Sequence, residues 1–378
     1  MTASSQIPDL PTSRPCLGAE EVTALEAVVA SHWLGTGALT QRFEDEIASF
    51  LGATHVIALN SGTAAIHIAL EACGIGSGDA VIVPSFTFVS TIQAIVATGA
   101  RPIFCEIEPD SGQLCVDDAL SRITPETRAI LPVHYGGTSV DLDPLLSQAQ
   151  ARGLKIIEDA AHAFGSSYRD HQIGTLGDVT CFSFDPIKNI TCGGGGAAVT
   201  ESAELAARLR MLANVGLPLD SWSRMMRPEG MSFDVSGHGY RYRMLDLNAA
   251  IGLQQLPKAR GFQERKLAIV RRYDDAFQNI PGLALLRRDW DSTFPFHYAI
   301  RVVDGRQQAL AAHLRSGGIG TTIHFPANHL HAAFARYATP LPITEQMVRE
   351  ILTLPLYVGL SDTEVERVID AVRFFMTR

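Results

Sequence analysis

HVIALNSGTAAIHIAL (residues 55–70) carries the clearest fold signal in the chain, a short apolar strand that passes through small polar residues into a helix from Gly62. Four more apolar runs follow it, and helices are expected after three of them, near Ser90, Val116 and Asp143. These later runs are AVIVP (80–84), RPIFC (101–105), RAILPV (128–133) and KIIED (155–159). Strands that are apolar throughout are typical of a sheet covered by helices on both faces. The pattern predicts an α/β fold with a mostly parallel sheet and a ligand site at the carboxyl ends of its strands.

The segments outside this series predict a second, smaller unit. Helices are expected over 19–31, 40–51, 202–214 and 246–278, and a long loop over 216–243. Thr40 is the expected N-cap of the second helix, and Ser361 and Glu364 form a capping-box pattern before the final one. A chain of 378 residues is long enough for about two units. We expect an N-terminal arm plus a large α/β domain over 1–250 and a small C-terminal α+β domain over 251–378.

Composition and charge exclude several classes of protein. With 46% hydrophobic and 19% charged residues, the chain has material for a large core, and its net charge of −9 disfavours nucleic acid and anionic membranes as partners. The six cysteines form no C-x-x-C pair, which predicts neither a metal site nor a disulfide framework. No basic stretch followed by an apolar one opens the sequence, and no run reaches the ~18 apolar residues of a membrane helix. These features predict a cytoplasmic protein.

Residues 60–70 form the first of three segments suited to chemistry. Ser61, Gly62 and Thr63 lie where a strand turns into a helix, so free backbone N–H groups and hydroxyls there suit an anion such as a phosphate. An ordinary N-cap explains the same residues, and this segment alone favours the cap.

The other two segments supply an acid and a lysine. Asp159 follows an apolar strand, and a carboxylate there needs a cation or hydrogen bonds, although a helix cap is an alternative. His162 nearby is either a ligand contact or an ordinary hydrogen-bonded residue. Lys188 lies between two expected strands in an apolar, glycine-rich setting, where desolvation makes a lysine a nucleophile or base; the alternative is a surface lysine. A phosphate turn, an acid and a lysine together match the requirements of pyridoxal 5'-phosphate (PLP).

Longer motifs connect the whole chain to one family. The sequence resembles the DegT/DnrJ/EryC1/StrS sugar aminotransferases, which belong to fold type I of the PLP enzymes, from Pro15 to about Phe375. The resemblance rests on RPCLGAEEV, FEDEIASFLGATHVIALNSGTAAIHIAL, VIVPSFTFVSTIQAI, PVHYGG, IIEDAAHAFGSSY, GDVTCFSFDPIKN, YRYRMLDLNAAIGLQQL, IHFPANHL and LPLYVGLSDTEVERVIDAV. It implies a three-layer sandwich built on the mostly parallel sheet, followed by the smaller C-terminal α+β domain.

The resemblance also implies roles for individual residues around the cofactor ring. Lys188 forms the Schiff base with PLP and moves the proton, and Asp159 pairs with the pyridine nitrogen. Phe88 stacks on the ring, and His162 stands beside the ring oxygen, where many members have Gln.

Further implied roles concern the phosphate, the substrate and a second subunit. Gly62, Thr63 and Ser183 belong to the phosphate cup, with Ala64 also among the cofactor-binding residues. The family builds each site with residues of a second subunit, so the resemblance implies a homodimer in which YRYRM, with Arg241, reaches the neighbouring site. His324 and His329 are the expected substrate-binding residues.

Three departures from the family pattern concern mainly the substrate. The usual G-E-G-G is all glycine here, so Gly194 replaces a carboxylate, and Arg241 replaces a frequent Asn. The usual P-P-L-H becomes PANH over 326–329.

The implied activity is transfer of an amino group from an amino acid, by resemblance L-glutamate, to a keto sugar, expected to be nucleotide-linked, in amino sugar biosynthesis for a polysaccharide or antibiotic. An aminocyclitol ketone stays open as the acceptor. Two alternatives are a PLP-dependent sugar dehydratase and a non-catalytic regulatory relative. Lys188 argues against the first, because known dehydratases of the family carry His there, and the set Lys188, Asp159 and Ser183 argues against the second.

Overall fold

The computed structural model describes residues 9–217 and 235–378, so most of the predicted loop over 216–243 lies outside the described residues. The helices are α1 Ala19–Ala30, α2 Ala38–Leu51, α3 Gly62–Ala72, α4 Val89–Ala97, α5 Val116–Ser121, α6 Leu142–Arg152, α7 Ala203–Ala213, α9 Asp246–Gln255, α10 Ala259–Phe277, α11 Gln307–Ser316, α12 Pro342–Glu350 and α13 Asp362–Met376. The strands are β1 His55–Leu59, β2 Ala80–Pro84, β3 Arg101–Cys105, β4 Thr127–Ile130, β5 Lys155–Asp159, β6 Ser167–Tyr168, β7 His171–Gln172, β8 Val179–Ser183, β9 Gly196–Thr200, β10 Leu283–Leu285, β11 Tyr298–Val302 and β12 Ile351–Leu354. Short 3₁₀ helices cover Tyr135–Gly137, Leu256–Lys258, Asn328–Leu330 and Ala332–Tyr337.

A seven-stranded sheet forms the centre of the molecule, with the strand order β1-β9-β8-β5-β4-β2-β3. Neighbours from β8 to β3 run parallel, whereas β9 runs antiparallel to both β1 and β8. The predicted α/β fold with a mostly parallel sheet is therefore confirmed. The reversal at β9 matters for function, because the hairpin between β8 and β9 holds Lys188 at the carboxyl end of the sheet.

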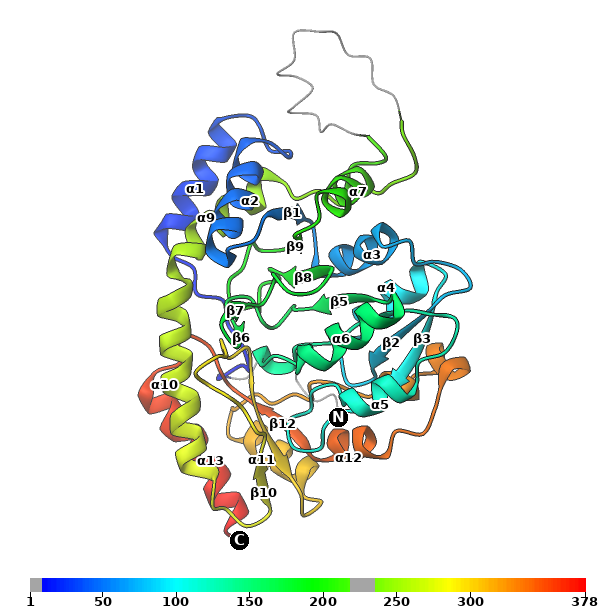
Figure 1. Ribbon diagram of the computed structural model, residues 1–378. Coiled ribbons are helices and arrows are strands. Elements are labelled where there is room, and N and C mark those ends of the chain that lie inside the picture. The colour runs from blue at the N-terminus through cyan, green and yellow to red at the C-terminus, as the bar shows by residue number, and fades with distance from the viewer. Residues whose placement is uncertain (1–8, 218–234) are drawn as a thin grey trace.

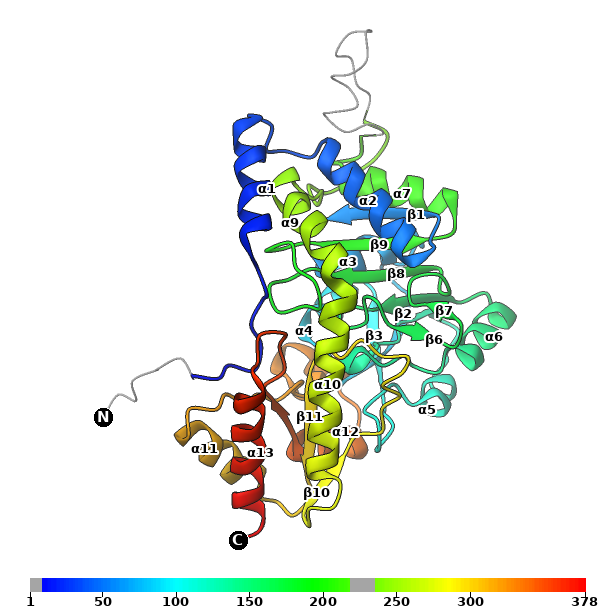
Figure 2. The ribbon, with the colours of Figure 1, turned by 90° about the vertical axis from the view of Figure 1, so that its left-hand side faces the viewer.

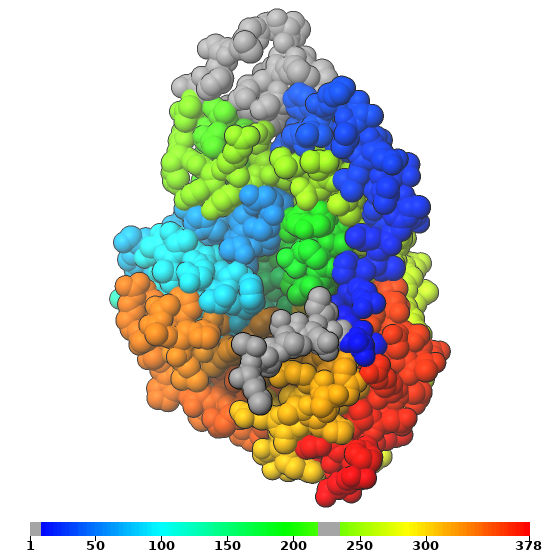
Figure 3. Space-filling model, turned by 180° about the vertical axis from the view of Figure 1, so that it is seen from behind, coloured from blue at the N-terminus to red at the C-terminus, as the bar shows by residue number. Residues whose placement is uncertain are grey.

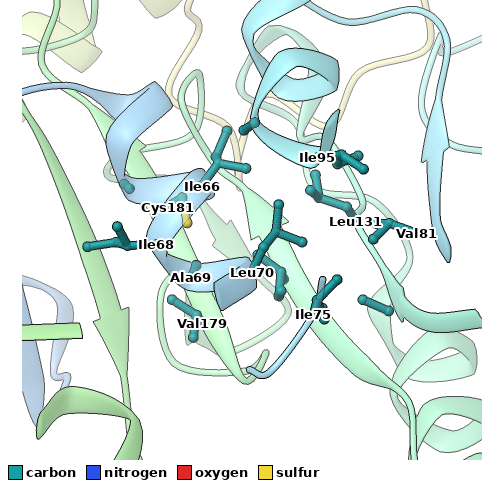
Figure 4. Packing of buried hydrophobic residues seen from close by; sticks show 14 of the residues in the cluster. Ile66, Ile68, Ala69, Leu70, Ile75, Val81, Ile95, Leu131, Val179 and Cys181 are labelled. Carbon is teal, nitrogen blue, oxygen red and sulfur yellow. The ribbon is translucent and has the colours of Figure 1, made fainter. Parts of the chain in front are cut away.

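Helices cover both faces of this sheet, because alternate residues of its strands point to opposite sides. Ile57 and Leu59 of β1 join one apolar cluster with α3, α4 and α7, whereas Val56 and Ala58 join another with α2 and α9. A third cluster packs α5 and α6 against the sheet. Figure 4 shows the first cluster, where side chains of α3 gather with those of β8, β2 and α4. These layers confirm the three-layer arrangement.

The C-terminal unit has its own sheet, with the order β10-β11-β12 and antiparallel pairing throughout. Its core joins this sheet to α10, α11 and α13. The long helix α10 belongs to two cores, with Phe262 packed under the large sheet and Ile269, Val270 and Tyr273 in the C-terminal unit. Figure 1 shows α10 running down one side of the molecule, and Figure 2 shows it beside α13. The division at residue 250 stays a prediction.

The ends of the described chain lie on the surface. Figure 3 shows the C-terminal unit, in orange and red, at the lower end and the N-terminal segment, in dark blue, along one side.

Helix α13 begins as predicted, since Ser361 accepts from the Glu364 amide and Glu364 accepts from the Ser361 amide. Among the described residues, no helix is long and apolar enough to cross a membrane.

Two local predictions are wrong for physical reasons. The expected single helix over 246–278 is interrupted by the 3₁₀ turn Leu256–Lys258, because Pro257 has no backbone N–H to continue the α-helix. Thr40 is not the N-cap of α2; that position is Gly37. The Asp246 carboxylate caps the helix instead, accepting from the Gly37 and Thr40 amides at 2.9 Å and from the Thr40 hydroxyl at 2.7 Å.

Candidate active site

A cavity of about 560 Å³ lies where the large sheet meets the C-terminal unit. Its walls come from the segments that follow β1, β2, β5 and β8 and from residues 322–326 of the C-terminal unit. Eight predicted site residues line it: Gly62, Thr63, Phe88, Asp159, His162, Ser183, Lys188 and His324. Residues more than 250 positions apart in sequence therefore meet in one space, at the strand ends where the fold predicts a ligand.

Lys188 lies in the turn between β8 and β9, with its amide donating to the Asp185 carbonyl at 3.0 Å. Its Nζ lies 4.4 Å from the ring centre of Phe296. Burial against apolar groups lowers the pKa of Lys188 to about 8, although Asp159 and Asp185 oppose this shift. A larger share of its amine is therefore neutral and nucleophilic near neutral pH than for an ordinary lysine.

This lowered pKa predicts that Lys188 in the apoprotein reacts with acylating reagents at a lower pH than an ordinary lysine does. With acetic anhydride, we expect its modification rate to reach half its maximum near pH 8. Lys155 is the control, because its hydrogen bond to Asp178 raises the pKa of that lysine above the usual 10.5. Mass spectrometry of labelled peptides measures both residues in one sample. A midpoint for Lys188 as high as that of Lys155 would contradict the desolvated environment.

Asp159 ends β5 and is 5% exposed. Its Oδ2 accepts from the Thr91 hydroxyl at 2.7 Å, and its Oδ1 accepts from the Ala161 amide at 3.1 Å. The Thr91 hydroxyl also lies 3.1 Å from that of Thr87. Both carboxylate oxygens thus have hydrogen-bond donors, which fix the direction of the carboxylate.

His162 lies in a wall of aromatic rings. It stacks on Phe296 at 4.0 Å between ring centres and 11° between planes, and on Phe325 at 5.6 Å. Burial holds the pKa of His162 well below its usual value, so the ring is neutral. The Gly136 amide donates to Nδ1 at 3.4 Å, which leaves the proton on Nε2. His162 is therefore a neutral hydrogen-bond donor.

The turn after β1 serves both as an ordinary N-cap and as part of the cavity wall, so both interpretations of its sequence apply. Ser61 is the N-cap of α3 and accepts from the Ala64 amide at 3.1 Å, so Ala64 is committed to the cap and does not line the cavity. Gly62 and Thr63 do line it, beside Ser183. The start of α3 thus presents backbone N–H groups to the cavity.

Gly62 is required by close packing rather than by an unusual φ. A Cβ at this position would lie 2.8 Å from Ser183 Cβ and 3.3 Å from the Phe182 carbonyl oxygen. We expect Gly62→Ala to lower the free energy of unfolding by about 1–3 kcal/mol and to weaken cofactor binding, because α3 must move away from Ser183. Gly261→Ala is the control, since its Cβ meets nothing within 4 Å. Thermal unfolding and cofactor titration test the pair, and equal behaviour of both variants would contradict the packing.

Arg241 lies outside the cavity of its own chain and is exposed. Its neighbours in the motif contact other residues of the same chain: the Tyr240 hydroxyl donates to Glu71 at 2.7 Å, and the Tyr242 hydroxyl lies 3.3 Å from His67 Nδ1. The two tyrosine rings stack at 4.9 Å. Alternation along an extended segment turns Arg241 away from these contacts.

The two predicted substrate histidines differ in position. His324 lines the cavity, its Nδ1 lies 3.1 Å from the Thr353 hydroxyl, and burial lowers its pKa to about 4. His329 is 3% exposed and does not line the cavity. Its Nδ1 lies 2.7 Å from the Ser85 hydroxyl and its Nε2 lies 3.5 Å from Glu345. The contact with Ser85 connects the 3₁₀ segment Asn328–Leu330 to the loop after β2, whereas Glu345 lies on α12.

Three further residues that shape the site escaped the sequence analysis. Asn328 donates through Nδ2 to the carbonyls of Ser85, at 2.9 Å, and Thr87, at 2.7 Å, and thereby holds the segment that carries Phe88. Thr91 had only a weak signal in the sequence, since it lies four residues after Thr87. Phe296 had none, because its contact with Lys188 spans more than a hundred residues.

The residues of the cavity fit PLP. Asp159 is a doubly hydrogen-bonded carboxylate suited to a pyridinium nitrogen, and Lys188 is a lysine with a lowered pKa in the same cavity. The start of α3 offers N–H groups to a phosphate, and Phe88 exposes 56% of its surface beside them. An arrangement of this kind can hold the cofactor and move a proton next to it.

Comparisons with known proteins agree with this geometry. The sequence profile of the DegT/DnrJ/EryC1/StrS aminotransferase family matches residues 15–373. The aminotransferase TlmJ from Streptoalloteichus hindustanus is 34% identical, with a TM-score of 0.91 over 97% of this chain and 99% of that chain. DesV from S. venezuelae, solved with a ketimine intermediate, is 36% identical, with a TM-score of 0.88 over 95% of each chain. The putative sugar aminotransferase Spr1654 from Streptococcus pneumoniae, solved in a PLP form, is 27% identical, with a TM-score of 0.89 over 97% of this chain and 98% of that chain. The chain therefore belongs to the DegT/DnrJ/EryC1/StrS family of sugar aminotransferases and is a PLP-dependent transaminase.

Proposed function

We propose that this transaminase moves an amino group from L-glutamate to the ketone of a nucleotide-linked sugar, as a step in amino sugar biosynthesis. The observation that carries the proposal is the meeting of Lys188 and Asp159 in one large cavity between the two units. Similarity to proteins named as sugar aminotransferases supports a sugar acceptor.

When bound, PLP supplies the electron sink for the negative charge that develops on the donor Cα. Lys188 would anchor the cofactor covalently, and its neutral Nζ, once free, would take the proton from the donor Cα and deliver it to the cofactor carbon on the other side of the amino nitrogen. Asp159 stays charged against the pyridine nitrogen, with Thr91 fixing its direction. Nε2–H of His162 would donate to the ring oxygen. The same steps, in reverse, add the amino group to the ketone.

The remaining residues bind and exclude water. Gly62, Thr63 and Ser183 would hold the phosphate, and Phe88 would stack on the ring. The wall formed by His162, Phe296 and Phe325 shields Lys188 from water, which favours its neutral form. His324 faces the space left for substrate.

The donor half-reaction tests the transaminase against its two alternatives. We expect L-glutamate to convert the PLP absorbance to that of the pyridoxamine form, with release of 2-oxoglutarate. A non-catalytic relative leaves the spectrum unchanged. A dehydratase removes a hydroxyl from the keto sugar and leaves no nitrogen on it, which mass spectrometry of the product reveals.

We also propose a homodimer in which Arg241 reaches the partner's cofactor phosphate. Helix α1 exposes Val22 by 56% and Val29 by 59%, two apolar side chains seven residues apart on one face. Arg241 is exposed, and it lies between Tyr240 and Tyr242, whose side chains contact other residues of the same chain. The planar guanidinium suits paired hydrogen bonds to phosphate oxygens.

Mixing two inactive variants tests this shared site. We expect Lys188→Ala and Arg241→Glu chains, unfolded and refolded together, to regain about a quarter of wild-type activity, because about half of the dimers are mixed and each has one intact site. Each variant refolded alone is the control. Mixed dimers without activity would contradict a site shared between subunits.

Arg241→Ala separates the phosphate contact from an interface salt bridge. The contact predicts weaker cofactor affinity in an intact dimer, whereas the bridge predicts weaker dimerisation in sedimentation.

A further inference from the structure

Lys266 is a buried lysine that the reaction described above does not use. It lies on α10, is 4% exposed and donates from Nζ to Asn189 Oδ1 at 3.0 Å. Within the part of the chain that the structure describes, no carboxylate lies within ion-pair distance of it. Desolvation lowers the pKa of Lys266 to about 7. Burying an amine without a counter-charge lowers the stability of the protein. A buried lysine at this position therefore calls for a functional explanation, and its hydrogen bond to Asn189 is where we look for one.

Asn189 directly follows Lys188 and is 5% exposed. Its Nδ2 donates to the Phe294 carbonyl at 3.1 Å, while its Oδ1 accepts from Lys266. The carbonyl on one side and the amine on the other fix which end of the amide is which. The Asn189 side chain is thus held at both ends.

The segment bonded to Asn189 also forms the wall behind the reactive amine. Phe296, two residues after Phe294, lies 4.4 Å from Lys188 Nζ and stacks on His162 at 4.0 Å. The Lys266 amine itself lies 5.7 Å from the Phe294 ring centre. Contacts among Lys266, Asn189 and Phe294 therefore connect three distant segments: the β8–β9 turn, the segment before β11 and helix α10.

We propose that Lys266 is a positioning residue that holds the Lys188 turn, through Asn189, against the Phe294–Phe296 segment. The inference rests on the proposed role of Lys188. A neutral amine donates a hydrogen bond as an ammonium does, so the contact persists whether Lys266 is protonated or not. Loss of the donor leaves Asn189 Oδ1 buried without a partner, which favours opening of the turn.

Hydrogen exchange of the apoprotein tests the contact without any activity measurement. We expect Lys266→Met to speed amide exchange in peptides covering 184–195 by about threefold or more, since the turn opens more often. Arg271→Met is the matched control, because Arg271 lies on the same helix and pairs with the exposed Asp291. We also expect covalent attachment of added PLP to Lys188 to slow by about tenfold in Lys266→Met, measured by absorbance.

A second variant shows whether the effect passes through Asn189. In an Asn189→Leu background, Lys266→Met should add almost nothing to either measurement, because the contact is already absent. If Lys266→Met fails to fold, Asn189→Leu alone must show the faster exchange and slower attachment. Unchanged exchange and attachment in the folded variants, or effects that simply add, would overturn the proposal. Faster exchange with PLP attached to a different lysine would instead overturn the proposed role of Lys188 and leave the contact standing.

Discussion

Lys188→Ala is expected to abolish transamination, with kcat lower by at least about 10²–10⁴-fold, because the variant lacks both the covalent anchor and the proton carrier. Noncovalent binding of PLP should survive, since the start of α3 and Asp159 are unchanged. Exchange of isotope-labelled 2-oxoglutarate into L-glutamate, which needs no sugar acceptor, measures the loss. Lys155→Ala is the control, because that lysine pairs with Asp178 away from the cavity.

Borohydride reduction of the holoenzyme identifies the residue that carries the cofactor. We expect peptide mapping to find the label on Lys188 and to find none in Lys188→Ala. A label on another lysine, or wild-type turnover by the variant, would show that the assignment is wrong.

Asp159→Asn should lower kcat by about 10- to 100-fold, because the amide keeps the shape of the side chain but not its charge. The protonated pyridine nitrogen then lacks its anionic partner, and the ring accepts electrons less readily. Stability should fall by only about 1 kcal/mol, since an Asn oxygen can still accept from the Ala161 amide. Asp143→Asn is the control, because Asp143 forms a surface ion pair with Arg169. Unchanged kcat in Asp159→Asn would contradict the charge role.

Local sequence was sufficient to predict the central sheet and the site residues that lie at the ends of its strands. Apolar strands predicted the sheet, and Asp159 and Lys188 were candidates because each ends or follows a strand that opens into the same edge, whereas Ser183 was implied by the family resemblance. The capping box of Ser361 and Glu364 could likewise be predicted, since both partners lie within four residues of each other. In each case the residues that determine the structure lie close together in the sequence.

Contacts between distant segments could not be predicted. The cap of α2 is Asp246, more than two hundred residues away, so Thr40 looked like the cap from its neighbours alone. Phe296 reaches Lys188, and Lys266 reaches Asn189, only because α10 and the C-terminal unit pack against the large sheet. Sequence periodicity describes one element at a time and carries no signal for such pairings.

The most direct test of amino transfer to a sugar is a single turnover of the pyridoxamine form. Enzyme first converted with L-glutamate and freed of it is mixed with each of a panel of nucleotide-linked keto sugars, with an aminocyclitol ketone included. We predict that at least one nucleotide-linked keto sugar restores the PLP absorbance and yields the corresponding amino sugar by mass spectrometry. If 2-oxoglutarate restores the PLP absorbance but none of the nucleotide-linked sugars does, the proposed amino transfer to such a sugar is contradicted.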